Sequence, residues 1–241
     1  MNVQGVPYAV GTGPGAGEGP VPEEDGEQRS GETMDSRAWD ERYAAADLVW
    51  GGEPNRWVVR EAGGLAPGLA LDLAAGEGRN ALWLAARGWR VTAVDFSAVA
   101  LERGARLAGN LPPEARERLD WVRADVASYR PGAGAFELVL VIYLHLPADE
   151  RRAVLRRAAE AVAPGGVLLV VGHDTVNLTE GVGGPQDAAV LFTPGDVLDD
   201  LAGSGLESRR AERVRRPVAG PEGGQAHAVD ALVRMERPRP A

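Results

Sequence analysis

Short apolar runs alternate with amphipathic helical stretches along the chain from Pro67 onward. Strands and helices that alternate in this way form a parallel sheet with helices on both of its faces. The run 136–142 is apolar at nearly every position, as expected for a strand that is covered on both sides. The pattern therefore predicts an α/β fold with a doubly wound, mostly parallel sheet.

Helices are expected between most of the strands. The first runs through 81–85, and Ser97 and Pro147 lie where two later helices begin. The helix after Pro147 is expected to stop at 164–166, where a proline and two glycines follow one another. The segment 172–194 has little periodicity. Within it, the glycines and apolar residues of 174–192 predict a loop that covers a substrate, and the alternative is a variable surface connection. The strands are predicted at 69–73, 90–94, 121–124, 136–142, 167–171, 206–214 and 228–234.

The first 33 residues differ in composition from the rest of the chain. They are rich in Gly, Pro and Glu and contain almost no apolar clusters, so packing cannot offset the entropy lost on ordering them. Residues 1–33 are predicted to be a disordered acidic tail, and residues 34–241 a single domain. Within that domain, 34–66 is expected to form a helical N-terminal cap, because Trp39 and Tyr43 lie four positions apart.

Charge and composition exclude several classes of function. The formal net charge of -9 argues against a general surface for polyanions, so no nucleic-acid partner is expected. All the basic residues are arginines, and the clusters at 151–157 and 209–216 are interpreted as solvated faces. The chain has no apolar run long enough to span a membrane and no secretory signal, so a cytoplasmic location is expected. Three histidines without cysteine predict no metal site.

One glycine-containing segment carries most of the functional information. Residues 71–80 read LDLAAGEGRN, and the next strand ends in VDFS. Gly76 and Gly78 permit backbone geometry that lets a ligand approach a helix N-terminus, and Asp95 can accept hydrogen bonds from two ribose hydroxyls. The same spacing fits a dinucleotide fingerprint, which makes an NAD(P)-dependent oxidoreductase the alternative. Asp72 argues against it, because a pyrophosphate would be repelled by a nearby carboxylate.

These residues resemble motif I and the following acidic position of the class I S-adenosylmethionine-dependent methyltransferases. The segments 124–126, 136–143 and 163–166 follow in the order found in that family. The resemblance covers roughly residues 35–237 and implies a Rossmann-like sheet with an antiparallel last strand. It also implies methyl transfer from S-adenosylmethionine to an acceptor by direct in-line displacement, with S-adenosylhomocysteine as the product. A catalytically silent adenosylmethionine-binding module is a further alternative.

Within the class, the chain resembles the small-molecule branch that includes the tellurite-resistance and thiopurine methyltransferases. Residues 39–43 and 54–55 resemble the N-terminal segment of that branch, and the Gly-Arg-Asn sequence at 78–80 resembles its version of motif I. Ala74 departs from the family, because many members have a glycine there, and its methyl group leaves less room beside the methionyl portion. The sequence at 141–145 is not the Asn/Asp-Pro-Pro-aromatic signature of enzymes that methylate bases or glutamine. A small-molecule acceptor is therefore expected, for a monomer or a homodimer.

The resemblance implies a set of cofactor contacts. Asp72 is expected to orient the glycine loop and the methionyl ammonium, and Asp95 to bind the ribose. Asp125 and Val126 are expected to flank the adenine, and Phe96 to cover one of its faces. The alternatives are a helix N-cap for Asp95, a turn aspartate for Asp125 and a core residue for Phe96. The complete expected set is Tyr43, Asp72, Ala74, Gly76, Gly78, Asn80, Asp95, Phe96, Ser97, Asp125, Val126 and Val141.

Three polar residues follow neighbouring strands on the expected acceptor side. His145 comes just after the fourth strand, and His173 and Asp174 come just after the fifth. They are predicted to bind or deprotonate the acceptor, because a histidine exchanges its proton near neutral pH. The alternative for each histidine is a solvated or hydrogen-bonded loop residue. A thiol or another soft anion would need little acid–base help, whereas a hydroxyl or an amine would need a base.

Overall fold

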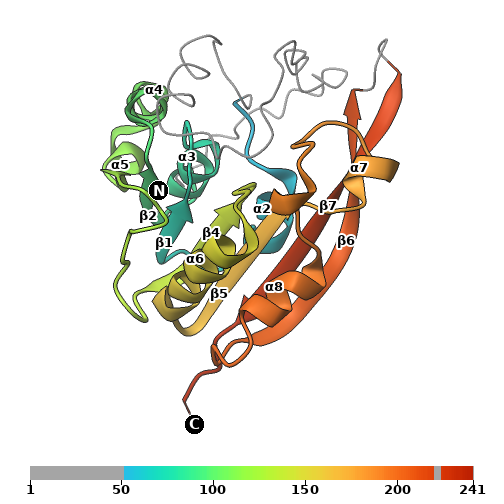
Figure 1. Cartoon of the computed structure of the whole chain (residues 1–241). Coiled ribbons are helices and arrows are strands. Elements are labelled where there is room, and N and C mark those ends of the chain that lie inside the picture. The colour runs from blue at the N-terminus through green and yellow to red at the C-terminus, as the bar shows by residue number, and fades with distance from the viewer. Residues whose placement is uncertain (1–51, 220–223, 241) are drawn as a thin grey trace.

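The computed structural model describes residues 52–219 and 224–240 (Figure 1). The predicted tail and Tyr43 lie outside these residues. Much of the predicted N-terminal cap also lies outside them. The elements follow one another in the order α2 (Arg56–Ala62), β1 (Leu69–Leu73), α3 (Arg79–Ala86), β2 (Arg90–Asp95), α4 (Ala98–Ala108), α5 (Pro113–Arg116), β3 (Leu119–Arg123), β4 (Phe136–Ile142), α6 (Ala148–Ala161), β5 (Val162–His173), α7 (Asn177–Glu180), η1 (Ala188–Val190), α8 (Pro194–Asp200), β6 (Glu207–Ala219) and β7 (Gln225–Glu236).

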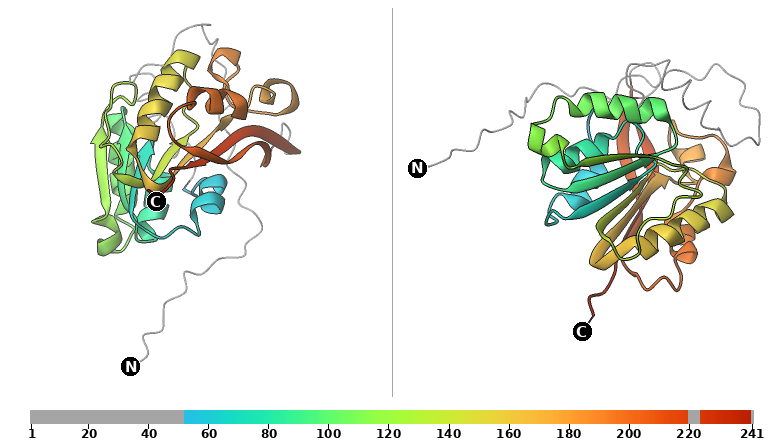
Figure 2. Two further views of the ribbon diagram at one scale, coloured as in Figure 1. Left: turned by 90° about the horizontal axis from the view of Figure 1, so that it is seen from below. Right: turned by 90° about the vertical axis from the view of Figure 1, so that its left-hand side faces the viewer.

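The described strands form one seven-stranded sheet in the order β3-β2-β1-β4-β5-β7-β6. Neighbouring strands are parallel from β3 to β5, whereas β7 is antiparallel to both β5 and β6. Helices lie on both sides of the sheet (Figure 2). The predicted α/β, doubly wound and mostly parallel fold is therefore confirmed. The strand order reverses next to β1, which pairs with both β2 and β4, and ligands of such sheets bind at the carboxyl ends of the strands at this point.

Each face of the sheet has its own hydrophobic core. Helices α2 and α3 pack on one face, and α6 and α8 pack on the other. Side chains alternate along a strand, so on β4 Leu138 and Leu140 face the first core while Val139 and Val141 face the second. This double burial explains why the β4 sequence is apolar at nearly every position, and it fixes the carboxyl ends of the central strands.

Several strand boundaries differ from the predictions; for example, β6 runs to Ala219 and β7 begins at Gln225, so both strands are longer than predicted. Helix α6 ends at Ala161, and Val162 already has an extended conformation and pairs with Phe136, five residues before the predicted start of β5. The helix ends early because the residue before Pro164 disfavours helical geometry. Strand β3 begins two residues earlier than predicted, because its partly exposed edge position admits polar residues such as Asp120 that hide the strand pattern.

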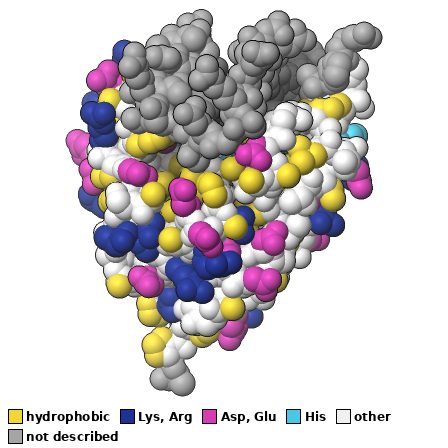
Figure 3. Space-filling model, in the orientation of Figure 1, with side chains coloured by type: hydrophobic (Ala, Val, Ile, Leu, Met, Phe, Trp, Pro, Cys, Tyr) yellow, Lys and Arg dark blue, Asp and Glu magenta, His cyan; other side chains and the backbone are white. Residues whose placement is uncertain are grey.

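The arginines of α6 attach this helix to α8. Arg151 is buried, and its Nε lies 2.8 Å from Oδ2 of Asp200, while Nε of Arg152 lies 3.0 Å from Oδ1 of the same carboxylate. Arginine and acidic side chains are interspersed over this face of the molecule (Figure 3). The interpretation of this cluster as a solvated face is therefore wrong for Arg151, because the sequence pattern does not show which charges are paired across helices.

None of the helices in the described part of the chain combines the length and the apolar character that crossing a bilayer requires.

Candidate active site

The glycine loop between β1 and α3 turns through three left-handed residues. Ala74, Gly76 and Gly78 have φ values of 57°, 57° and 76°. Glycine adopts this geometry at little cost, whereas alanine is strained by about 1 kcal/mol. The departure from the family pattern at Ala74 therefore keeps a left-handed turn at an energetic cost. Gly78 is the N-cap of α3, so the turn delivers the chain directly into the helix N-terminus.

Asp95 ties the glycine loop to the end of β2. Its Oδ2 accepts a hydrogen bond from the backbone N–H of Gly76 at 2.8 Å, and its Oδ1 accepts one from Ser97 at 2.9 Å. The N-cap of α4 is Ser97, whose hydroxyl accepts from the N–H of Ala100 at 3.1 Å. These backbone groups use two of the about four acceptor positions of a carboxylate. Asp95 is thus buried where the strand order reverses, and it holds the glycine loop in place; its role as a ribose ligand remains a prediction.

Asp72 lies beneath this loop in an apolar setting. Burial is the largest cause that raises its pKa to about 7, and the Arg79 guanidinium opposes the rise while the Asp95 carboxylate adds to it. Its Oδ2 is buried without a hydrogen-bond partner. Desolvation and the neighbouring Asp95 carboxylate both disfavour the ionised form of Asp72 when it is unpaired. A cationic group beside this oxygen would therefore be bound favourably.

Asn80 connects the two segments that carry the resemblance to the small-molecule branch. Its side-chain oxygen accepts a hydrogen bond from the backbone N–H of Asn55 at 2.9 Å. Asn55 in turn caps α2, because its side-chain oxygen accepts from the N–H of Trp57 at 2.9 Å. Asn80 therefore positions α2 beside the glycine loop, and its predicted contact with the cofactor remains a prediction. Arg79, its neighbour in the motif, was missed as a site residue although its charge acts on Asp72.

The residues predicted for the adenine end lie at the edge of the same region. Asp125 is exposed, and its Oδ1 accepts from the backbone N–H of Ala127 at 2.8 Å, which is the turn geometry of the alternative. Phe96 and Val126 are half-buried, and Val141 is buried within β4. The adenine contacts of these residues remain predictions.

A buried carboxylate lies beside the two predicted histidines. Oδ2 of Asp230 on β7 accepts hydrogen bonds from Trp57 Nε1 at 3.0 Å, from the Tyr143 hydroxyl at 2.9 Å and from Arg216 Nε at 3.2 Å. His173 Nδ1 lies 3.5 Å from Oδ1 of the same carboxylate, and neither atom has a hydrogen-bond partner. We call these five residues the Asp230 hub. Sequence reasoning missed this carboxylate, because a single aspartate inside an apolar strand carries no local signal.

The structure brings the two predicted histidines together at this hub. Their rings stack with centroids 5.4 Å apart, and His145 Nε2 accepts a hydrogen bond from the backbone N–H of His173 at 3.1 Å. Burial and the neighbouring His173 lower the pKa of His145 to about 3. Burial and the Arg216 guanidinium lower the pKa of His173 to about 4. Both imidazoles are therefore neutral at neutral pH.

Tyr143 connects β4 to this hub through a strained backbone. It has a φ of 55°, a conformation that residues other than glycine rarely adopt. Burial raises the pKa of its hydroxyl, and the Asp230 carboxylate adds to the rise. The hydroxyl therefore stays protonated and donates to Asp230.

Asp174 is held away from the hub, although it is adjacent in sequence to His173. Its Oδ2 lies 2.9 Å from Nε of Arg213, and its Oδ1 accepts from the backbone N–H of Val176 at 3.0 Å. It is fully buried in these contacts. Asp174 therefore shapes the turn after β5, and its catalytic role remains a prediction without geometric support.

The loop after β5 covers His173. A Cβ added to Gly184 would lie 2.6 Å from Cδ2 of the His173 ring, so only a bare backbone fits against this imidazole. The buried side chain of Asn177 fixes the loop, because its Nδ2 donates to the carbonyl of Gly183 at 2.7 Å and its Oδ1 accepts from the N–H of Val229 at 2.7 Å. These hydrogen bonds therefore fix the loop to β7, where it covers the His173 side of the hub.

Comparisons with known proteins agree with this geometry. Residues 70–166, which include Asp72 and Asp95, match the methyltransferase domain family. An uncharacterized methyltransferase of Mycobacterium tuberculosis is 37% identical over 113 residues, which are 46% of this chain and 54% of the relative. The chain thus spans about half the length of the curated relatives that it matches.

Solved structures show the same fold. TehB from Haemophilus influenzae aligns with a TM-score of 0.60 at 16% identity, over 84% of this chain and 66% of that one. The 1,6-didemethyltoxoflavin-N1-methyltransferase of Burkholderia thailandensis, which holds its substrate and S-adenosylhomocysteine, aligns with a TM-score of 0.53 at 22% identity, over 76% and 75%. The seven-stranded sheet is therefore the class I methyltransferase fold. Residues 70–166 thus resemble a methyltransferase domain in sequence, and they lie within a sheet that has the methyltransferase fold.

Proposed function

We propose that the chain transfers a methyl group from S-adenosylmethionine to a small-molecule acceptor by direct in-line displacement. The observation that carries the proposal is the buried Asp95 carboxylate, which binds the backbone of Gly76 where the strand order reverses. The methyltransferase domain match over 70–166 supports it. An oxidoreductase is disfavoured, because the pyrophosphate of NAD(P) would be repelled by the buried Asp72 carboxylate.

The cradle around the glycine loop fits this cofactor. Asp95 would hold the ribose hydroxyls, and the unpartnered Oδ2 of Asp72 would face the cationic methionyl end. A cation beside Asp72 would stabilise its ionised form and reverse the effect of burial on its pKa. Phe96, Asp125 and Val126 would border the adenine. When bound, S-adenosylmethionine supplies a methyl group that is already activated on a cationic sulfonium.

The proposed acceptor side favours a reaction that depends on how the acceptor is aligned with the methyl group, and not on removal of a proton by a base. His173 would contact the acceptor, while His145 holds the backbone of His173 in place through the bond to its N–H. Both pKa values lie far below 7, so neither imidazole is a strong base. A thiolate or a similar soft anion therefore suits the site better than an amine or a hydroxyl. The acceptor atom bonds to the methyl carbon while the carbon–sulfur bond breaks, and the electron pair stays on sulfur to give S-adenosylhomocysteine.

The relation to the small-molecule branch is part of the same proposal. The hydrogen bond between Asn80 and Asn55 joins the two segments that resemble this branch, and the likeness to TehB supports the same placement.

A methyl-transfer screen with labelled S-adenosylmethionine tests the proposal. Thiols, hydroxyl compounds and amines are offered to the wild type and to His173→Ala, with His227→Ala as the control because His227 is exposed and outside the hub. We expect label in thiol products, reduced turnover in His173→Ala at unchanged cofactor affinity, and wild-type turnover in the control. Wild-type turnover in His173→Ala would remove this residue from the acceptor site, and tight NADP binding without S-adenosylmethionine binding would overturn the whole proposal.

A further inference from the structure

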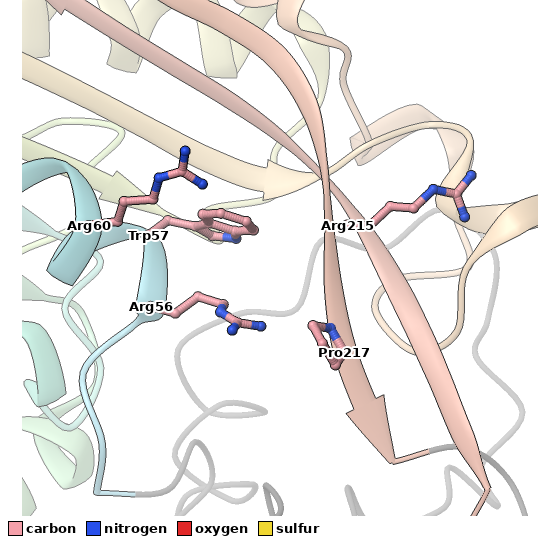
Figure 4. A pocket seen from close by; sticks show the side chains of 5 residues that line it. All are labelled: Arg56, Trp57, Arg60, Arg215 and Pro217. Atoms are coloured by element: carbon pink, nitrogen blue, oxygen red, sulfur yellow. The ribbon is translucent and has the colours of Figure 1, made fainter.

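A cavity of about 350 Å³ lies between α2 and β6, on the outer side of the Asp230 hub. Arg56, Trp57 and Arg60 line it from α2, and Arg215 and Pro217 line it from β6 (Figure 4). This volume is at the lower end of the range for small-molecule sites. The cavity therefore suits a ligand of about one ring and its substituents.

Two guanidinium groups flank the indole of Trp57 in this cavity. The Cζ atoms of Arg56 and Arg60 lie 5.7 and 5.9 Å from the centroid of the Trp57 ring. Figure 4 shows Arg215 extending from β6 on the side away from the indole, where its guanidinium lies 2.6 Å from Oε2 of Glu180. The charge that faces the cavity is therefore that of Arg56 and Arg60.

Carboxylates of the described residues leave this charge largely unbalanced. No carboxylate of residues 52–219 and 224–240 lies within ion-pair distance of Arg56. Glu61 is 3.8 Å from Arg60, but its carboxylate is hydrogen-bonded to Arg210 of β6. An incoming anion would therefore meet two guanidinium groups without displacing a strong internal partner.

One side chain joins the cavity to the acceptor side. Trp57 lines the cavity and donates its indole N–H to Asp230 at the centre of the hub. Arg216 also donates to Asp230, so the buried negative charge has its own cationic partner. An anion at Arg56 and Arg60 would thus sit one indole away from His173 and Tyr143 without facing an uncompensated carboxylate.

We infer that this cavity binds the carboxylate of a small amphipathic organic acid, and that this acid is the methyl acceptor. Guanidinium groups bind carboxylates in a planar, bidentate geometry, and Pro217 and the edge of Trp57 offer apolar contact to the body of the acid. The assignment of the acid as acceptor rests on the proposed function. Binding of the carboxylate itself does not.

The test compares benzoate with benzamide, its neutral counterpart of the same shape, by titration calorimetry at constant ionic strength. We expect the wild type to bind benzoate about tenfold more tightly, as two charge-assisted hydrogen bonds provide. The variant Arg56→Gln/Arg60→Gln should lose this preference. Arg87→Gln is the matched control, because Arg87 lies 4.5 Å over the Trp83 ring at a site outside the cavity, and it should keep the preference.

Titration with S-adenosylhomocysteine separates this inference from the proposed function. Equal affinity for benzoate and benzamide, or a preference that survives in Arg56→Gln/Arg60→Gln, would overturn the inference even where the cofactor product binds. Loss of the preference in Arg87→Gln as well would overturn it too, because the effect would then be one of general charge. Failure of S-adenosylhomocysteine to bind would overturn the proposed function. The comparison of benzoate with benzamide would still decide whether the cavity binds a carboxylate.

Discussion

Replacing Asp72 with asparagine should make the cofactor-free protein more stable above neutral pH. Burial raises the pKa of this carboxyl from 3.8 to about 7, so between these pH values the unfolded chain has released a proton that the folded chain still holds. The free energy of unfolding must therefore fall as pH rises through this range, by about 1.4 kcal/mol per pH unit, and level off above about 7. Over about 3 units the loss is about 4 kcal/mol. The asparagine side chain cannot ionise, so the variant escapes this loss.

Urea denaturation of the wild type and of Asp72→Asn at several pH values from 5 to 8 measures this effect. The advantage of the variant should grow with pH, with about 4 kcal/mol as its upper limit because the buried amide of asparagine also needs a partner. The affinity of the wild type for S-adenosylmethionine should rise over the same range as Asp72 ionises, and the variant should lose that dependence. A difference between the unfolding free energies of the wild type and Asp72→Asn that is constant from pH 5 to 8 would refute the reasoning.

Three further predictions follow from the site. Gly78→Ala should destabilise the protein by about 1 to 3 kcal/mol more than Gly183→Ala in thermal and urea unfolding. Both positions have positive φ, but only a Cβ at position 78 would lie 2.3 Å from the Trp121 ring. Equal losses of stability in the two variants would contradict the clash. Asp230→Asn should cost about 3 to 5 kcal/mol of unfolding free energy, because it removes the buried carboxylate charge that pairs with Arg216 and accepts from Trp57 and Tyr143. A loss below about 1 kcal/mol would count against the hub. The kcat profile should show no inflection from His173 between pH 6 and 8, since its pKa is about 4; an inflection near 6.5 that vanishes in His173→Ala would show a base.

The architecture could be predicted from the sequence because it depends on local patterns. The continuous apolar run of β4 and the glycine turn before α3 were each placed correctly, since burial on both faces and left-handed geometry restrict residue choice at those positions. The predicted cofactor residues Asp72 and Asp95 lie close together, because neighbouring parallel strands end at the same edge of the sheet.

The Asp230 hub could not be predicted in this way. Its carboxylate meets Trp57, Tyr143 and Arg216, which come from the two ends of the domain and from its centre. Such contacts depend on the antiparallel pairing of β6 with β7, which no single segment encodes. For the same reason, Asp174 was grouped with His173 by its position, although its partner is Arg213 on β6.

Titration calorimetry of S-adenosylhomocysteine into the wild type and Asp95→Asn tests the central claim most directly. We expect binding in the micromolar range for the wild type, no comparable binding of NAD or NADP, and a loss of about 1.5 to 3 kcal/mol in the variant, the value of hydrogen bonds to a charged group. Circular dichroism confirms that the variant is folded. Unchanged affinity in folded Asp95→Asn, or NADP binding tighter than S-adenosylhomocysteine binding in the wild type, would contradict the account.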